Sequence, residues 1–200
     1  MSYAIIGFGS IGQALAKAFA RNGIEVSVAA KRGPESIAPT AATIGPTIIP
    51  KTLAEAVKAD VIFLAVRFEA HPEVVKALPT WQGKTVVDVT NAYGVPPEQL
   101  GDQPSSRFIA QAFTHARLVK GFNHLSAATL AQDPAVHGGR RVVFLASDDD
   151  AATAEIGALA EKLGFAPIEL GGLSEGGALV QARGNSWGHL IFKDLIKLDS

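Results

Sequence analysis

Three glycines near the start of the chain have the spacing of a phosphate-binding turn. They stand in the G-x-G-x-x-G order of "GFGSIG", after the apolar run "YAII" and before a helical pattern. In such a turn the first glycine allows a tight bend, the second leaves room for a pyrophosphate, and the third lets the helix pack closely. The N-terminus of the helix then favours an anion. This spacing predicts a dinucleotide site, with a purely structural turn as the alternative. The predicted site comprises Gly7, Phe8, Gly9, Ser10, Ile11 and Gly12.

The second apolar run lacks the acid that such sites commonly carry. Sites for NAD usually have an Asp or Glu about 20 residues after the glycines, where it binds a ribose hydroxyl. Here residues 27–32 read "SVAAKR", Glu25 begins the run, and Glu35 lies beyond it. A carboxylate would repel the 2′-phosphate of NADP, whereas Lys31 and Arg32 would attract it. We therefore predict NADP as the cofactor; the alternative is that the two cations form an ordinary solvated loop.

The elements that must position this loop are short apolar runs that alternate with helical patterns. Strands are expected over residues 3–6, 24–30, 47–50, 60–66, 85–90, 117–122, 140–147 and 166–170. Helical patterns cover residues 11–21, 34–45 (a short helix or turn), 52–59, 71–79, 104–113 and 148–164, and the remainder from 174 reads as helix interrupted by glycines. Strands joined by helices imply right-handed crossovers and a parallel sheet with both faces covered.

The predicted fold class is therefore α/β. We expect a doubly wound, mostly parallel Rossmann sheet in a single domain over residues 1–200, with residues 173–200 as a small helical C-terminal extension.

Composition narrows the classes of function. The 200 residues carry a formal net charge of −1, which gives no general attraction to nucleic acid or to an anionic membrane. The absence of cysteine excludes disulfides and thiolate chemistry, and the five histidines have no metal-ligand spacing, so no metal is expected. No apolar run approaches the roughly 18 residues of a membrane span, and "YAII" is expected to be a strand rather than a signal peptide. We expect a cytoplasmic protein.

Several stretches, in their order along the chain, resemble one family. They are "GFGSIGQALAKAFARNG", "KRGPES", "DVIFLAVRFEA", "VVDVTNAYG", "VKGFNHL" and "FLASDDDAA". The chain resembles the NADP-dependent oxidoreductases related to deazaflavin (factor-420) coenzyme reductases, whose Rossmann type also occurs in the cytoplasmic domains of membrane ferric reductases. The resemblance implies an NADP-binding domain, usually dimeric, and a flavin-like or deazaflavin ring as hydride acceptor. Arg67 stands where relatives more often have proline.

The ends of three expected strands supply the remaining candidate residues, because ligands of open parallel sheets bind outside the carboxyl ends of the strands. By resemblance, "LAVRF" and "VTN" would line the ribose and nicotinamide of NADP, which adds Ala65, Val66, Arg67 and Asn91 to the cofactor site. Asn91 either bonds the ribose or caps the following turn.

Two side chains are weak catalytic candidates. Arg67 either neutralises a pyrophosphate or an anionic acceptor, or pairs with Glu69. His124 either donates to an acceptor carbonyl or is structural. Hydride transfer between NADPH and a flavin-like ring needs close stacking and exclusion of water rather than an acid–base residue.

The leading hypothesis is an NADPH-dependent oxidoreductase that transfers hydride between NADP(H) and a flavin, deazaflavin or similar small acceptor, acting as a homodimer. One alternative is a non-catalytic NADP(H)-binding sensor or partner subunit. The other is a short relative of β-hydroxyacid dehydrogenases or imine reductases, although these need a long helical C-terminal domain. The apolar residues that could close the acceptor site or form a dimer seam are Leu179, Trp187, Leu190, Ile191 and Phe192.

Overall fold

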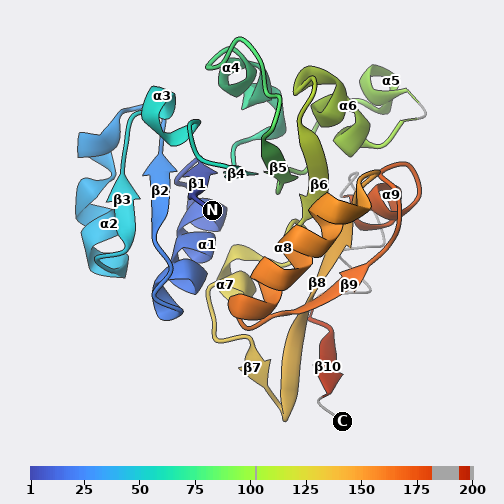
Figure 1. Ribbon diagram of the computed structural model, residues 1–200. Helices are drawn as coiled ribbons and strands as arrows, with labels where there is room; N and C mark the ends of the chain where they lie inside the picture. The colour runs from blue at the N-terminus through green and yellow to red at the C-terminus, as the bar shows by residue number, and fades with distance from the viewer. Residues whose placement is uncertain (102, 182–193, 199–200) are drawn as a thin grey trace.

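A computed structural model describes residues 1–101, 103–181 and 194–198 (Figure 1). Its central strands are β1 (Tyr3–Ile6), β2 (Val26–Ala29), β3 (Ile48–Pro50), β4 (Val61–Leu64), β5 (Thr85–Asp88) and β6 (Arg117–Gly121). They run parallel in the spatial order β3-β2-β1-β4-β5-β6. This is the order of doubly wound dinucleotide-binding sheets, in which the connections reverse direction between β1 and β4.

A longer strand extends the sheet beyond β6. Strand β8 (Gly139–Ala146) pairs antiparallel with β6, so the sheet is mostly parallel rather than wholly so. Three further strands pair with β8: β7 (Ala135–Val136) and β10 (Ile196–Leu198) antiparallel, and β9 (Ala166–Glu169) parallel.

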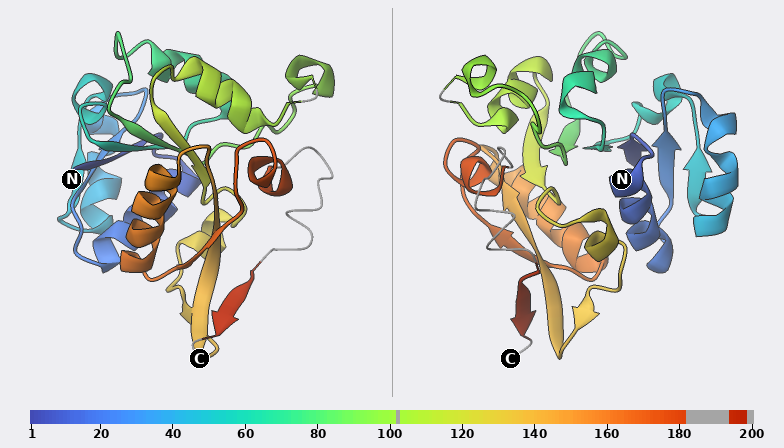
Figure 2. Two further views of the ribbon diagram at one scale, coloured as in Figure 1. Left: turned by 45° about the vertical axis from the view of Figure 1, so that its right-hand side comes forward. Right: turned by 180° about the vertical axis from the view of Figure 1, so that it is seen from behind.

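Both faces of the sheet are buried because successive side chains of a strand point to opposite sides. Ile5 and Phe63 belong to one core, whereas Ile6 and Leu64 belong to the other. The first core is covered by α1 (Ser10–Arg21), α2 (Ala38–Ile44), α7 (Ala127–Leu130) and α8 (Asp150–Lys162). The second is covered by α3 (Leu53–Ala56), α4 (His71–Val75), α5 (Pro97–Leu100) and α6 (Ser105–Ala112). Figure 2 shows the green helices α4 and α6 on one side of the strands and the blue α1 and orange α8 on the other.

The remaining helical segments are short. Two 3₁₀ turns, η1 (Pro34–Ser36) and η2 (Phe68–Ala70), each follow a strand end. Helix α9 (Gly176–Val180) packs against β8 through Val180. Within the described ranges, no helix combines the length and the apolar character needed to cross a bilayer.

Each of the eight expected strands is present, most of them shortened by one to three residues at their ends. The expectation of a helical segment interrupted by glycines from residue 174 is wrong for Ile196–Leu198, which form β10. This strand pairs with β8 where a Cβ on Gly139 would lie only 2.3 Å from the Lys197 carbonyl oxygen, so glycine permits the close approach. The predicted seam residues Trp187, Leu190, Ile191 and Phe192 lie outside the described residues.

Candidate functional site

The three glycines of the first loop play different physical parts. Gly7 has φ +102°, and a Cβ there would lie 2.3 Å from the Ala65 carbonyl oxygen. A Cβ on Gly12 would lie 1.9 Å from the Gly7 carbonyl oxygen, so both positions require glycine to bring β1, β4 and α1 together. A Cβ on Gly9 would meet nothing within 4 Å. The loop is therefore closed against the protein on one side and open on the other.

The open side of the loop is the start of a helix. Gly9 is the N-cap of α1, gives no side-chain cap, and is followed by a first turn without an acidic residue. The first N–H groups of a helix have no partner within it, and the helix dipole adds partial positive charge at this end. The geometry is that of a phosphate-binding helix start.

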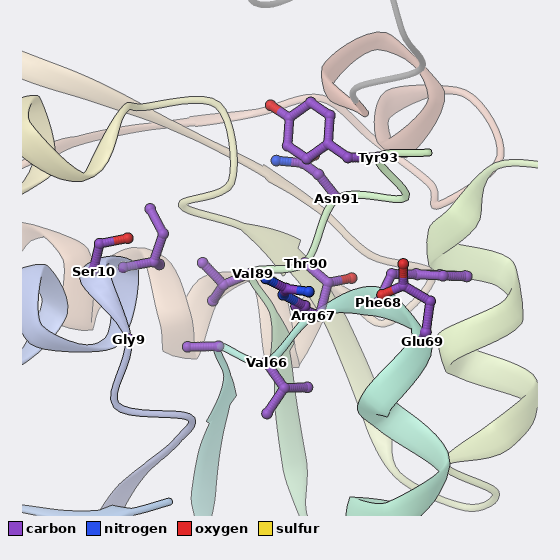
Figure 3. A pocket seen from close by; sticks show the side chains of 12 residues that line it. Gly9, Ser10, Val66, Arg67, Phe68, Glu69, Val89, Thr90, Asn91 and Tyr93 are labelled. Carbon is purple, nitrogen blue, oxygen red and sulfur yellow. The ribbon is translucent and has the colours of Figure 1, made fainter. Parts of the chain in front are cut away.

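A cavity of about 550 Å³ continues from this helix start along the carboxyl ends of three adjacent strands. Its walls come from the segments that follow β1, β4 and β5 (Figure 3). The lining residues are Gly9, Ser10, Ile11, Ala65, Val66, Arg67, Phe68, Glu69, Val89, Thr90, Asn91 and Tyr93. Seven predicted site residues therefore share one cavity: Gly9, Ser10, Ile11, Ala65, Val66, Arg67 and Asn91. Gly7, Phe8 and Gly12 support the loop from behind, where Phe8 is buried.

Lys31 and Arg32 lie outside this lining, at the corners of a turn that follows β2. The Gly33 N–H donates to the Ala30 carbonyl at 3.0 Å and closes the turn, and Gly33 has φ +85°. Both cations are exposed. Neither forms an ion pair within the part of the chain that the structure describes. Because β2 pairs with β1, two uncompensated positive charges lie at the same edge of the sheet as the glycine loop.

Arg67 is an exposed cation in the lining of the cavity itself. The predicted alternative, an ion pair with Glu69, is absent although both residues are described. Figure 3 places Arg67 in the segment that follows β4, with Ser10 of α1 to one side and Glu69 to the other. The guanidinium is therefore available to an anion in the cavity.

Asn91 lines the cavity, but its amide also bonds to the protein. Asn91 Nδ2 donates to the Asn123 carbonyl at 2.8 Å, and Asn123 Nδ2 donates to Asn91 Oδ1 at 3.0 Å. Asn123 Nδ2 also lies 2.8 Å from the Val180 carbonyl, which it can reach as donor. The pair links the segments after β5 and β6 to the end of α9. The sequence analysis expected Asn91 either to bond the ribose or to cap the following turn, and it did not predict these hydrogen bonds to Asn123.

Beneath Thr90 and Asn91 lies a buried ion pair that the sequence analysis missed. Lys120 Nζ lies 3.1 Å from Asp88 Oδ2, and both side chains are fully buried. Asp88 and Lys120 are direct cross-strand partners in the register of β5 and β6. Burial lowers the pKa of the Lys120 amine, while the Asp88 carboxylate acts in the opposite direction. The sequence feature that could have indicated this ion pair is a single charged residue within each of the apolar runs "VVDV" and "LVKGF".

Removal of one member of this pair is expected to cost far more stability than removal of both. An Asp88→Leu variant leaves the Lys120 amine buried without its carboxylate, which should lower the free energy of unfolding by about 3–5 kcal/mol. An Asp88→Leu/Lys120→Met variant replaces both charges with apolar atoms and should lose much less. Urea denaturation of the two variants measures the difference; equal losses would contradict this description of the pair.

His124 is placed away from the cavity lining. It is 2% exposed, and its ring packs against Phe144 with a centroid distance of 4.8 Å. It follows Phe122, a buried residue in the left-handed region with φ +59°. No group of three or more His, Asp or Glu side chains in the described ranges is arranged to hold a metal ion.

Comparison with known proteins shows what this chain is similar to. Residues 2–92, which include the glycine loop and extend through Asn91, match the family described as "NADP oxidoreductase coenzyme F420-dependent". The hypothetical protein SMa0349 from Sinorhizobium meliloti has a similar structure, with a TM-score of 0.90, 36% identity, and coverage of 98% of this chain and 96% of that one. A candidate F420-dependent NADP-reductase from Arthrobacter sp. FB24 has a TM-score of 0.71 and 26% identity, with 86% of each chain covered.

A curated protein, a metalloreductase, is also similar to this chain. Metalloreductase STEAP3 from Rattus norvegicus is 30% identical over 173 residues, which cover 85% of this chain but 34% of that protein. The chain thus spans about a third or less of the length of the curated relatives that it matches. The family match over residues 2–92, the Arthrobacter structure and metalloreductase STEAP3 confirm the resemblance that the motifs predicted: the chain has a Rossmann-like fold and is related to the coenzyme F420-dependent NADP oxidoreductases.

Proposed function

We propose that the protein is an NADPH-dependent oxidoreductase that transfers hydride between NADP(H) and a flavin, deazaflavin or similar small acceptor. The observation that carries this proposal is the continuity between the open side of Gly9 and the cavity at the ends of β1, β4 and β5. A dinucleotide with its pyrophosphate over the start of α1 would reach along this edge of the sheet. The family relation supports the same cofactor.

The turn after β2 supports NADP rather than NAD. A cofactor whose pyrophosphate lies over Gly9 would place its adenosine ribose towards the end of β2, as in other sheets of this strand order. Lys31 and Arg32 stand there, exposed and without an ion-pair partner in the described parts of the chain. We propose that they bind the 2′-phosphate, since guanidinium and ammonium groups form strong charge-assisted bonds with phosphate oxygens.

In the proposed reaction the residues of the chain orient the two reacting rings and shield them from water. Bound NADPH supplies the hydride, so no side chain has to donate or remove a proton at the reacting carbon. The chain has to hold two rings at a close distance and exclude water. Val66, Val89 and Thr90 provide a largely apolar wall for this purpose, and Figure 3 shows Tyr93 above them in the segment that follows β5.

Arg67 and Tyr93 suggest the chemistry of the acceptor. Tyr93 is 53% exposed in the wall of the cavity, and an aromatic ring there is a flat surface on which another ring can stack. Arg67 offers a cation in the same cavity. We propose that the preferred acceptor is a flat ring that carries an anionic group, with the ring near Tyr93 and the anion at Arg67.

FMN and riboflavin test this assignment because they share one ring and differ by a phosphate. The wild-type protein should have a higher kcat/KM for FMN than for riboflavin. An Arg67→Ala variant should lower kcat/KM for FMN by about 10- to 100-fold, the effect of one charged hydrogen bond, and leave riboflavin unchanged. An equal fall for both acceptors would contradict the assignment, and weaker NADPH binding would place Arg67 at the cofactor instead.

Steady-state NADPH oxidation with FMN, FAD, a deazaflavin and ferric chelates tests the proposed function as a whole. Turnover with one or more of these acceptors supports an oxidoreductase. Tight NADPH binding without turnover would favour the non-catalytic sensor. The second alternative, a short relative of β-hydroxyacid dehydrogenases or imine reductases, is disfavoured because the described residues after β6 form the strands β7 to β10 and helices of at most 13 residues.

We further propose a cytoplasmic homodimer that folds as one unit. Leu179, an exposed apolar side chain on α9, is the described member of the predicted seam and is 44% accessible. Light scattering of the purified protein measures the assembly directly.

A further inference from the structure

One buried ion pair holds every polar atom of Thr90. The Asp88 Oδ1 atom accepts hydrogen bonds from the Thr90 backbone N–H at 2.9 Å and from the Thr90 hydroxyl at 2.7 Å. Lys120 Nζ donates to the Thr90 carbonyl oxygen and to Asp88 Oδ2. Thr90 itself lines the cavity. The wall at the end of β5 is therefore fixed from behind by two charges that the cavity never exposes.

Packing alone does not require charges at this position. Both side chains are fully buried, and the loss of hydration for a buried ion pair often cancels the attraction between its members. The neighbouring cross-strand pairs in the same two strands, Val86 with Leu118 and Val87 with Val119, are apolar. An apolar pair would satisfy the sheet equally well, but it could not hold the N–H, hydroxyl and carbonyl of Thr90.

The next residue along the chain continues this arrangement. The Asn91 side chain donates to the backbone carbonyl of Asn123 and accepts from the Asn123 side chain; Asn123 follows β6, the strand that carries Lys120. Thr90 and Asn91 are thus fixed to β6 by two successive sets of hydrogen bonds, one ionic and one neutral. Together they form a hydrogen-bonded stretch of the cavity wall, next to the segment that follows β4 (Figure 3).

We infer that Lys120 and Asp88 are positioning residues for hydride transfer. By fixing Thr90, the neighbour of Asn91, the pair sets the surface against which the nicotinamide half of the cofactor lies, and so sets the distance between the donor and acceptor rings. Neither residue touches the ligand. The inference rests on the proposed function, and it adds which residues determine the orientation of the nicotinamide ring. Displacement of a reacting group by about 1 Å can slow a reaction about 100-fold, so a small shift of this wall would be sufficient.

The Asp88→Leu/Lys120→Met variant tests the inference because it replaces both charges with apolar side chains and removes the hydrogen bonds to Thr90. With NADPH and FMN, kcat should fall about 100-fold while the Kd for NADPH stays unchanged. The kinetic isotope effect with NADPH deuterated at the transferred position should rise, because hydride transfer becomes the slow step. A folded variant with wild-type kcat, or with a loss confined to NADPH affinity, would overturn the inference.

A second ion pair on the same strand provides the control. Arg117 begins β6 at the opposite edge of the sheet, and its guanidinium lies 2.6 Å from the Glu155 carboxylate. An Arg117→Met/Glu155→Gln variant removes a salt bridge of the same strand without changing the cavity. Its kcat and isotope effect should match those of the wild type; a loss as large as in the first variant would show that general loosening of β6 is responsible.

Fluorescence of bound NADPH separates failure of this inference from failure of the proposed function. If the wild-type protein binds NADPH but oxidises it with no acceptor, the proposed oxidoreductase fails while the positioning role is still measurable. Nicotinamide anisotropy should then be lower in the Asp88→Leu/Lys120→Met complex than in the wild-type complex. Equal anisotropy would overturn the inference, and absence of NADPH binding by the wild type would overturn both.

Discussion

A Gly9→Val variant is expected to lose NADPH binding while it unfolds at the same urea concentration as the parent protein. The N-cap backbone at Gly9 has φ −77°, which any residue adopts, and a Cβ there meets no protein atom within 4 Å. The added side chain would therefore occupy only the space above the start of α1. That is the space through which a pyrophosphate must approach the helix N–H groups. Titration by nicotinamide fluorescence, alongside a denaturation curve, measures both properties.

Gly12→Ala is the matched control in the same loop. A Cβ at Gly12 would lie 1.9 Å from the Gly7 carbonyl oxygen, so this smaller substitution should destabilise the fold by about 3 kcal/mol. The two variants thus separate binding from folding within four residues. Undiminished NADPH affinity in Gly9→Val would place the cofactor elsewhere and remove the basis of the proposed site.

Arg32→Ala is expected to lower the affinity for NADPH by about 10- to 100-fold and to leave the affinity for NADH unchanged, because one charge-assisted phosphate contact is lost. A Lys31→Ala/Arg32→Ala variant should nearly abolish the preference between the two cofactors. Both cations are exposed at the turn after β2, so their removal should not affect folding. Isothermal titration of the wild type and both variants with each cofactor gives the dissociation constants required.

Lys17→Ala provides a control for charge alone, because Lys17 is an exposed cation on α1 and its removal changes the net charge by the same amount. It should leave the ratio of NADPH to NADH affinity as in the wild type. If Arg32→Ala weakens both cofactors equally, Lys31 and Arg32 form an ordinary solvated turn, and the assignment of the 2′-phosphate fails.

The sequence predicted most of the fold because the fold depends on local patterns. The run "VIFL" is apolar at every position since β4 is buried on both faces, and the glycine spacing identified the bend between β1 and α1. Ile196–Leu198 was assigned wrongly because its pairing with β8 is formed between residues far apart in the sequence. No local pattern specifies such a partner.

The sequence predicted those residues of the candidate site that directly follow a strand, because the end of a strand determines where the next residues lie. Ala65, Val66, Arg67 and Asn91 line one cavity, as their position after adjacent parallel strands leads one to expect. Asp88 and Lys120 were missed because a charge within an apolar strand gains meaning only from the register that pairs it with another. The reciprocal contact between Asn91 and Asn123 likewise needs the spatial order of β5 and β6.

Anaerobic mixing of the protein with NADPH and FMN tests the central claim most directly. The proposed function predicts that NADPH is oxidised and FMN reduced in equal amounts, at a rate proportional to protein concentration and faster than with NADH at the same concentration. Binding of NADPH without any reduction of FMN, FAD or a deazaflavin would contradict it and leave a protein that holds the cofactor without using it.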